Sequence, residues 1–199
     1  MHAGKYDIGR QHEGRSSPSC GTHASNSSDQ SRGPFVSATA AEHRAQAPAV
    51  VRCAAITVSD TRTVETDIGG RSVIESLTVA GHSVVQRQIV PDEPEAIAAQ
   101  LTAWSDTDGL DLILTTGGTG LSPRDTTPEA TLSVAQRLVP GIPEAMRAAS
   151  LAVTPHAMLS RGVAVIRGRT LIINLPGSPK AARENLAAVA AALPHALEK

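Results

Sequence analysis

From residue 50 onward, short apolar and β-branched runs alternate with longer segments of helical spacing, and this alternation constrains the fold most strongly. Strands are expected at residues 52–58, 83–90, 110–115, 162–167 and 170–174. Helices are expected at 70–80, from 94, from 126, from 143 to 151, and from 179 to the end. Such alternation is typical of a three-layer α/β/α sandwich, in which helices cover both faces of a mostly parallel sheet. A barrel would need more strand–helix units than about 150 residues provide.

Residues 1–50 have a different composition, rich in Ser, Gly, His, Gln and Ala, with almost no aliphatic residue before Val36. Such a segment buries too little apolar surface to offset the entropy lost on ordering, so a disordered tail is expected. The competing interpretations are a partner-binding extension, an amphipathic targeting peptide, which its low apolar content disfavours, and a dispensable tail or a start codon assigned too far upstream. The folded domain is expected over residues 51–199.

The charge balance and the cysteines exclude several function classes. The net charge is −1, which gives no general attraction for nucleic acid or for an acidic membrane surface. The two cysteines, Cys20 and Cys53, form no CxxC pair and no zinc spacing. No apolar run approaches the roughly 18 residues of a membrane span. A cytoplasmic protein is the expectation.

The most informative stretch is Leu112–Glu129, LILTTGGTGLSPRDTTPE, where a buried strand leads through a Gly-rich loop into a helix. Glycines let the backbone turn tightly, and free N–H groups beside a helix N-terminus bind anions. The expected phosphate-binding residues are Thr116, Gly117, Gly118, Thr119, Gly120 and Ser122. The loop has neither the P-loop spacing nor the dinucleotide-binding spacing. A plain tight turn is the competing interpretation.

Further polar residues follow the Gly-rich loop and two other predicted strands. Asp125 follows the Gly-rich loop, Asp92 follows the strand at 83–90, and Ser59 and Asp60 follow the strand at 52–58. A carboxylate beside a phosphate site can hold Mg²⁺, which offsets the repulsion between the two anions. A turn residue or helix cap is the alternative for Asp92 and Asp125. Ligands of open α/β sheets bind beyond the carboxyl ends of the strands, so these groups are expected to converge.

The last strand repeats this pattern. It leads into Pro176, Gly177 and Ser178, and Lys180 then stands in the first turn of a helix as a possible phosphate ligand. Ser160 and Arg161 precede another strand and are candidates for a phosphate or ring contact, with a surface salt bridge as the alternative. Trp104 is expected to pack in the core. The scattered histidines and the absence of a nucleophile elbow leave nucleophilic catalysis unsupported.

The segments TTGGTGLSPRDTTPEAT, PGIPEAMR, MLSRGVAVIRG and TLIINLPGSPKA, in this order, resemble the MogA/MoaB molybdopterin-binding family. The resemblance covers residues 51–199, and MLSR and LPGSPKA are similar to the adenylyltransferase branch. It implies transfer of AMP from Mg-ATP to the molybdopterin phosphate with release of pyrophosphate, usually by a homotrimer. It also raises the enzyme that inserts the metal in the same pathway as a possible partner.

The resemblance assigns roles to residues that match the family's motifs. Asp125 is expected to act in catalysis and to hold Mg²⁺, and Asp92 to act near the pterin or the metal. The Gly-rich loop, Ser160, Arg161 and the loop from Pro176 to Lys180 are expected to bind molybdopterin and ATP. Two other functions stay open: a non-catalytic molybdopterin carrier or scaffold, and a nucleotide-cleaving enzyme on the same fold.

Overall fold

The computed structural model describes residues 50–106 and 109–197. The tail expected at residues 1–50 lies almost wholly outside the described residues, so its proposed roles stay predictions. The described elements, in chain order, are β1 (Arg52–Val58), α2 (Ile68–Val79), β2 (Ser83–Val90), α3 (Pro94–Ser105), β3 (Leu112–Thr116), α4 (Thr127–Ser133), β4 (Arg137–Leu138), α5 (Gly141–Leu151), the 3-10 helix η1 (Pro155–Leu159), β5 (Ala164–Arg167), β6 (Thr170–Leu175), α6 (Pro179–Ala190) and α7 (Leu193–Ala196).

The strands form one six-stranded sheet in the order β2-β1-β3-β6-β5-β4. The pairs β1–β2, β1–β3 and β3–β6 are parallel, whereas β5–β6 and β4–β5 are antiparallel. The predicted mostly parallel sheet is therefore confirmed. The antiparallel pair β5–β6 is a hairpin, which turns at Gly168 with a positive φ of 57°.

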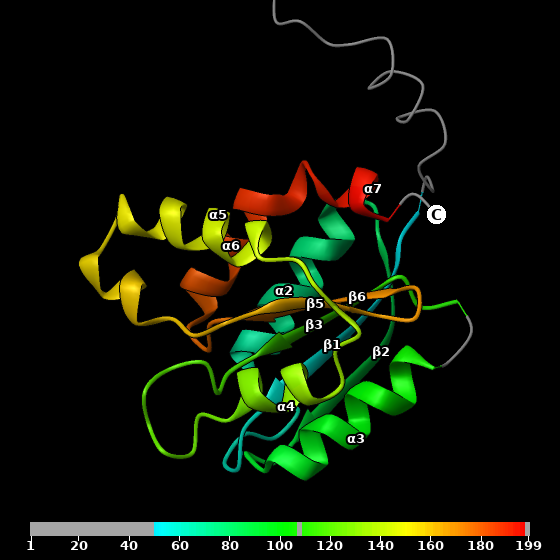
Figure 1. Cartoon of the computed structure of the whole chain (residues 1–199), viewed down its shortest axis with the longest axis horizontal. Helices are drawn as coiled ribbons and strands as arrows, with labels where there is room; N and C mark the ends of the chain where they lie inside the picture. The colour runs from blue at the N-terminus through cyan, green and yellow to red at the C-terminus, as the bar shows by residue number, and fades with distance from the viewer. Residues whose placement is uncertain (1–49, 107–108, 198–199) are drawn as a thin grey trace, which may run out of the picture. The chain divides into compact units, whose positions relative to one another are not determined.

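Helices cover both faces of the sheet, which confirms the three-layer architecture (Figure 1). On one face, α2, α5, α6 and α7 pack through Leu77, Met146, Leu186 and Leu193, among others. On the other face, α3 and α4 pack through residues that include Ile97, Leu101 and Ala130. Neighbouring strand residues alternate between the two cores: Leu112 and Leu114 face the first, and Ile113 faces the second.

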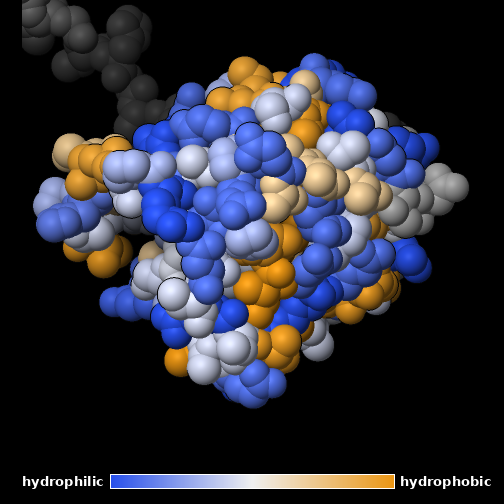
Figure 2. All heavy atoms as spheres, turned by 90° about the horizontal axis from the view of Figure 1, so that it is seen from below, coloured by the Kyte–Doolittle hydropathy of each residue, from blue (hydrophilic) through white to orange (hydrophobic). Residues whose placement is uncertain are grey.

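Trp104 packs in the second core at 8% exposure, as expected from its place on the apolar face of α3. The face seen from below carries apolar atoms across its middle, among polar ones (Figure 2). Scattered apolar side chains are ordinary on a protein surface, so this face does not by itself indicate a partner. The homotrimer stays a prediction. No helix in the described ranges is long and apolar enough to cross a membrane.

Several predicted boundaries were wrong. Helix α2 begins at Ile68 instead of residue 70, because Asp67 caps it, and α5 begins at Gly141, ahead of Pro143. Strand β3 runs from 112 to 116, and β5 begins at 164. Strand β4 and η1 were not predicted, because elements of two and five residues leave little periodic signal. Near Pro194 the last helix is divided into α6 and α7.

Candidate functional site

The sheet topology brings the predicted site residues to one edge. Strands β1, β2, β3 and β6 run parallel, so the loops that follow them leave from the same side of the sheet. The chain first moves outward from β1 to β2 and then returns to β3 on the other side of β1. The loops after β1 and β3 therefore diverge, and ligands of open α/β sheets bind at such a switch point. The segment before the antiparallel β5, with Ser160 and Arg161, reaches this edge too.

At its first two residues, the Gly-rich loop at 117–120 has a backbone that only glycine accommodates. Gly117 and Gly118 have positive φ angles of 103° and 63°. A Cβ on Gly117 would lie 2.5 Å from the Val58 carbonyl oxygen, and one on Gly118 would lie 2.3 Å from Thr127 Oγ1. Thr127 fixes the loop by donating from Oγ1 to the Gly117 oxygen at 3.0 Å and from its amide to the Gly118 oxygen at 3.1 Å.

The loop after β6 packs directly against the Gly-rich loop. Thr116 Oγ1 donates to the Pro176 oxygen at 2.8 Å, and a Cβ on Gly177 would lie 3.3 Å from the Gly117 Cα. We call residues 117–120 and 176–178 together the glycine cradle. A polar hollow of about 400 Å³ opens on one side of it, lined by Thr57, Val58, Ser59, Arg62, Asp67, Ile68, Gly69, Thr116, Gly117, Gly177 and Pro179. This hollow lies at the N-terminus of α2, whose dipole favours anions.

Asp60 and Asp92 hold the ends of β1 and β2 together. The Asp60 amide donates to Asp92 Oδ2 at 3.2 Å, and the Asp92 amide donates to Asp60 Oδ1 at 3.0 Å. Ser59 adds to this junction by donating from its amide to the Val90 oxygen at 2.9 Å. The reciprocal arrangement places two carboxylates side by side at the ligand edge, as the sequence predicted for these strand ends.

Asp125 and Arg124 join this pair from the loop after β3. Asp125 Oδ2 accepts the Ser122 amide at 2.8 Å, and Gly120 leaves room for that carboxylate. Arg124 Nη2 forms an ion pair with Asp60 Oδ2. We call Asp60, Asp92 and Asp125 the acidic trio. Arg124 is the cation that the structure pairs with it.

The electrostatics of the trio differ from those of an ordinary surface carboxylate. Burial raises the pKa of Asp92, and the nearby charges of Asp60 and Asp125 raise it further, against lowering by the Asp60 amide and Arg124. An added cation would therefore stabilise the ionised form of Asp92. Within residues 50–106 and 109–197, no three His, Cys, Asp or Glu side chains are grouped to hold a metal. Mg²⁺ usually takes one or two carboxylates plus phosphate and water, and the oxygen donors of the trio fit that chemistry.

Arg161 occupies a structural position beside the cradle. Its Nε donates to the backbone oxygen of Gly120 at 2.7 Å. Its two Nη atoms donate to the carboxylate of Glu129 and to the backbone oxygen of Asp125. Its amide also donates to the Thr119 oxygen at 3.0 Å. The guanidinium is thus occupied with holding the Gly-rich loop, and its role as a substrate ligand stays a prediction. Thr126 and Glu129 have the sequence spacing of a capping box, but none forms, because Glu129 pairs with Arg161 and Thr126 Oγ1 is buried without a partner.

A second hollow, of about 300 Å³, lies on the other side of the cradle. Four predicted site residues line it: Thr119, Gly120, Ser160 and Pro176. Ser178 precedes α6 as its N-cap residue. Lys180 is 73% exposed, and its Nζ lies 3.9 Å from Glu184 on the same helix, so this structure pairs it with α6 instead of with the cradle. Its phosphate-binding role stays a prediction.

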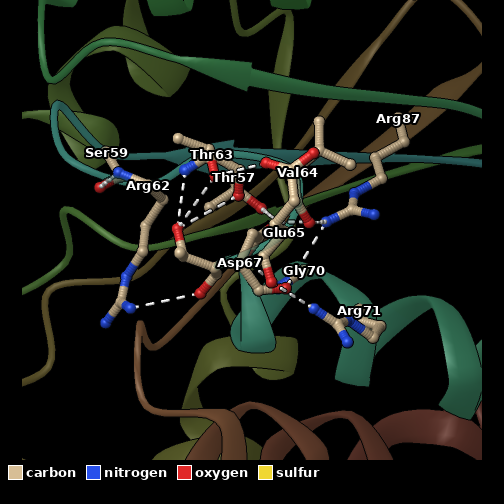
Figure 3. Close-up of polar contacts among 11 residues, drawn as sticks. Thr57, Ser59, Arg62, Thr63, Val64, Glu65, Asp67, Gly70, Arg71 and Arg87 are labelled. Atoms are coloured by element: carbon tan, nitrogen blue, oxygen red, sulfur yellow. Dashed lines mark hydrogen bonds and ion pairs between the residues drawn. The ribbon is translucent and has the colours of Figure 1, made fainter.

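One buried carboxylate was missed by the sequence analysis. Asp67, 1% exposed, accepts the Gly70 amide at 2.8 Å, Thr57 Oγ1 at 2.7 Å and Arg87 Nη2 at 2.8 Å (Figure 3). Burial raises its pKa, but the hydrogen bonds from Arg87, Gly70 and Thr57 outweigh burial and lower it. An Asp that directly precedes the helical segment Ile68-Gly69-Gly70 is an N-cap signal, and that signal would have located it.

Cys53 contributes no nucleophile to the site. It is buried in β1, and burial followed by the charge of Asp111 raises the pKa of its thiol to about 12. A protonated, buried thiol is unreactive. The chemistry available at this edge is therefore that of carboxylates, backbone amides and hydroxyls acting on an anionic ligand.

Comparisons with known proteins agree with this geometry. Residues 54–195 match the family described as a probable molybdopterin binding domain. Gephyrin of Dictyostelium discoideum is 56% identical over 110 residues, which is 55% of this chain but 15% of gephyrin. Molybdenum cofactor biosynthesis protein B of Bacillus anthracis is 40% identical over 144 residues, covering 71% of this chain and 85% of that protein. Molybdopterin adenylyltransferase of Haemophilus influenzae is 50% identical over 105 residues, 53% of each chain.

The solved structures include the molybdopterin biosynthesis enzyme MoaB from Thermus thermophilus, with a TM-score of 0.69 and 52% identity. That match covers 74% of this chain and 94% of the MoaB chain. The family match spans more than half of the chain, and the relatives and the fold agree with it. The chain therefore belongs to the molybdopterin-binding family of molybdenum cofactor biosynthesis proteins.

Proposed function

We propose that this protein is a molybdopterin adenylyltransferase, which transfers AMP from ATP to the terminal phosphate of molybdopterin and releases pyrophosphate. The observation that carries the proposal is that the glycine cradle, whose backbone lies open to close approach, stands beside the acidic trio at one sheet edge. Amide donors favour phosphate, whereas carboxylates repel it unless a cation intervenes. Relatives named molybdopterin adenylyltransferase support the same reaction.

The reaction needs positioning more than proton transfer. An oxygen of the molybdopterin phosphate attacks the α-phosphorus of ATP, a new P–O–P linkage forms, and the bond to the β-phosphate breaks with its electron pair leaving on pyrophosphate. A phosphate monoester with a second pKa of about 6 is largely ionised at neutral pH, so no general base is required. The cradle amides would hold phosphate oxygens in line, and Thr116 and Ser122 border the same loop.

Mg²⁺, when bound, would neutralise charge on the phosphates as they approach the trio. Asp125 is the proposed ligand, because its carboxylate is fixed by the Ser122 amide beside the cradle. Asp92 would stand next to it as the second acidic group of the site. Its raised pKa is consistent with a position that favours an added cation.

The test is AMP incorporation into molybdopterin by the full-length chain with Mg-ATP, followed by mass spectrometry and by pyrophosphate release. Asp125→Ala is expected to lower the transfer rate about 100- to 1,000-fold, since it removes a charge contact made to the reacting phosphates. Asp106→Ala is the matched control. Asp106 is an exposed aspartate that pairs with Arg167 beyond the end of α3, and its loss should change the rate less than about twofold.

Two results would contradict the proposal. A folded wild-type chain that binds molybdopterin but transfers no AMP would indicate the carrier function. Release of products from a nucleotide without any pterin would indicate the nucleotide-cleaving function. Whether a metal-insertion enzyme takes over the product is a separate prediction, which co-purification with that class of enzyme would test.

A further inference from the structure

The loop from Gly120 to Asp125 carries one carboxylate of the acidic trio and projects from the sheet edge between β3 and α4 (Figure 1). Within the loop, the Asp125 amide donates to the Ser122 oxygen at 2.9 Å, and the Ser122 amide donates to Asp125 Oδ2 at 2.8 Å. These bonds fix the carboxylate relative to the loop. Contacts from outside the loop have to fix it relative to Asp60 and Asp92.

Arg161 supplies such a contact from the segment before β5. Its Nε donates to the backbone oxygen of Gly120 at 2.7 Å, and one Nη donates to the backbone oxygen of Asp125. The other Nη pairs with Glu129, in the first turn of α4. A guanidinium presents its donors in one rigid plane. A single side chain therefore joins both ends of the loop and the helix that follows it.

The backbone that carries Arg161 is itself tied to the sheet. The Arg161 amide donates to the Thr119 oxygen at 3.0 Å, and the Val163 amide donates to Asn174 Oδ1 at 3.3 Å. Asn174 belongs to β6 and is 1% exposed. Gly162 lets the two segments approach closely, because a Cβ there would lie 3.0 Å from the Asn174 backbone oxygen. The guanidinium thus reaches the loop from a segment anchored at the centre of the sheet.

Arg124 makes a second link between this loop and the trio, through its ion pair with Asp60. Its side chain is 67% exposed, whereas that of Arg161 is 35% exposed and also bonds two backbone oxygens. An exposed ion pair contributes little, because holding two long side chains in one geometry costs entropy. The two arginines therefore differ: Arg124 contributes charge to the trio, and Arg161 contributes geometry.

We propose that Arg161 is a positioning residue, which holds the Asp125 carboxylate where it can bind a divalent cation together with the Asp60–Asp92 pair. The inference rests on the cation site of the proposed function and adds the residue that gives this site its shape. Groups that orient metal ligands commonly set the affinity for the metal, and their loss typically costs about 10- to 100-fold. Charge alone predicts the opposite, since removing a nearby cation favours binding of a metal ion. The direction of the change therefore distinguishes positioning from charge.

The test measures the dissociation constant of Mn²⁺ for the full-length chain, without nucleotide, by electron paramagnetic resonance. Arg161→Ala and Arg161→Lys are each expected to weaken Mn²⁺ binding about tenfold. Lysine keeps the charge, but its single ammonium does not reproduce three planar contacts. The matched control is Arg167→Ala. Arg167 also joins a carboxylate, of Asp106, to a backbone oxygen, of Val134, and its loss should change the affinity less than about twofold.

A double-mutant comparison identifies the route. If Arg161 acts through Asp125, Arg161→Lys should change Mn²⁺ affinity less than about twofold in the Asp125→Ala background. An equal loss in both backgrounds would overturn the inference, because Arg161 would then act without Asp125. A purely structural role would lower the melting temperature and leave the Mn²⁺ affinity of the folded variants unchanged.

The remaining outcomes also decide the question. Unchanged or tighter Mn²⁺ binding by Arg161→Lys, with its fold verified by circular dichroism, would overturn the inference. This variant keeps the charge and the backbone bond to Thr119, so it serves as the test if the alanine variant does not fold. A wild-type chain that does not bind Mn²⁺ would overturn the cation site of the proposed function as well. A wild-type chain that binds Mn²⁺ and transfers AMP, while both variants bind Mn²⁺ normally, would overturn this inference alone.

Discussion

Asp67 and the acidic trio are carboxylates near the same edge of the sheet, yet their surroundings are opposite. Asp67 is buried and receives three hydrogen bonds, including one from the guanidinium of Arg87. The trio is partly exposed, and burial, together with the nearby charges of Asp60 and Asp125, raises the pKa of Asp92. The pKa of Asp67 is lowered, whereas that of Asp92 is raised. Burial raises the pKa of both groups, and only at Asp67 do the hydrogen bonds outweigh it.

This difference distinguishes a carboxylate that stabilises the fold from carboxylates that are available to a ligand. A carboxylate whose hydrogen bonds are satisfied within the fold stabilises the fold and has little left to offer a ligand. A carboxylate held near like charges gains from an added cation, which is how metal and phosphate sites commonly arise. The comparison therefore predicts that Asp67 variants lose stability first, and that variants at the trio lose activity first.

The largest effect on stability is expected for Asp67→Ala. The change leaves the partly buried Arg87 without its partner and removes the N-cap of α2, so the free energy of unfolding should fall by about 3–5 kcal/mol. Urea unfolding followed by circular dichroism would measure it. A loss below about 1 kcal/mol would mean that the Asp67 network is not structural, and the comparison would fail.

The pH dependence of the same group gives an independent test. Because folding lowers the pKa of Asp67, its stabilisation is present above the ordinary carboxyl pKa of about 3.9 and is lost as the pH falls through the lower folded pKa. The stability difference between wild type and Asp67→Asn should therefore shrink in acid. A difference that stays constant from neutral pH to pH 2 would contradict the assignment.

A smaller effect is expected for Arg124→Ala, which removes the cation paired with Asp60. Arg124 is 67% exposed, so the loss in stability should stay below about 1 kcal/mol. The trio becomes more negative, and its affinity for Mn²⁺, measured by electron paramagnetic resonance without nucleotide, should rise up to about fivefold. Arg137→Ala, on β4, is a control expected to leave Mn²⁺ affinity unchanged. Weaker Mn²⁺ binding in Arg124→Ala would argue against a cation site at the trio.

The smallest effect on stability is expected for Asp92→Asn, and it is a gain where the other variants lose stability. Since folding raises the pKa of Asp92, the ionised group destabilises the fold as the pH rises through that pKa. The variant should gain up to about 0.5 kcal/mol at neutral pH, a figure kept small because solvent screens this half-exposed group. It should gain nothing at pH 3. Thermal unfolding at the two pH values would measure the change in stability. An AMP-transfer assay of the same variant should show a loss of activity.

The local pattern of the sequence predicted the layers and the convergence of candidate polar residues at one edge of the sheet. Alternating strand and helix signals indicated the α/β/α sandwich, and the polar residues after each strand were located because parallel strands end at one edge. Asp60 and Asp92 are the clearest case, since each amide donates to the other's carboxylate across two strand ends. Short elements such as β4 gave no periodic signal and were missed.

Sequence by itself determined which residues carry polar chemistry and which strand each one follows. Only the tertiary structure decided their partners: Arg161 holds the Gly-rich loop, Glu129 pairs with Arg161 instead of capping a helix, and Arg87 neutralises Asp67. These contacts join positions 20 to 41 residues apart. The reason is physical, because a side chain's pKa and availability depend on burial and on neighbours brought close by folding, which local periodicity does not encode.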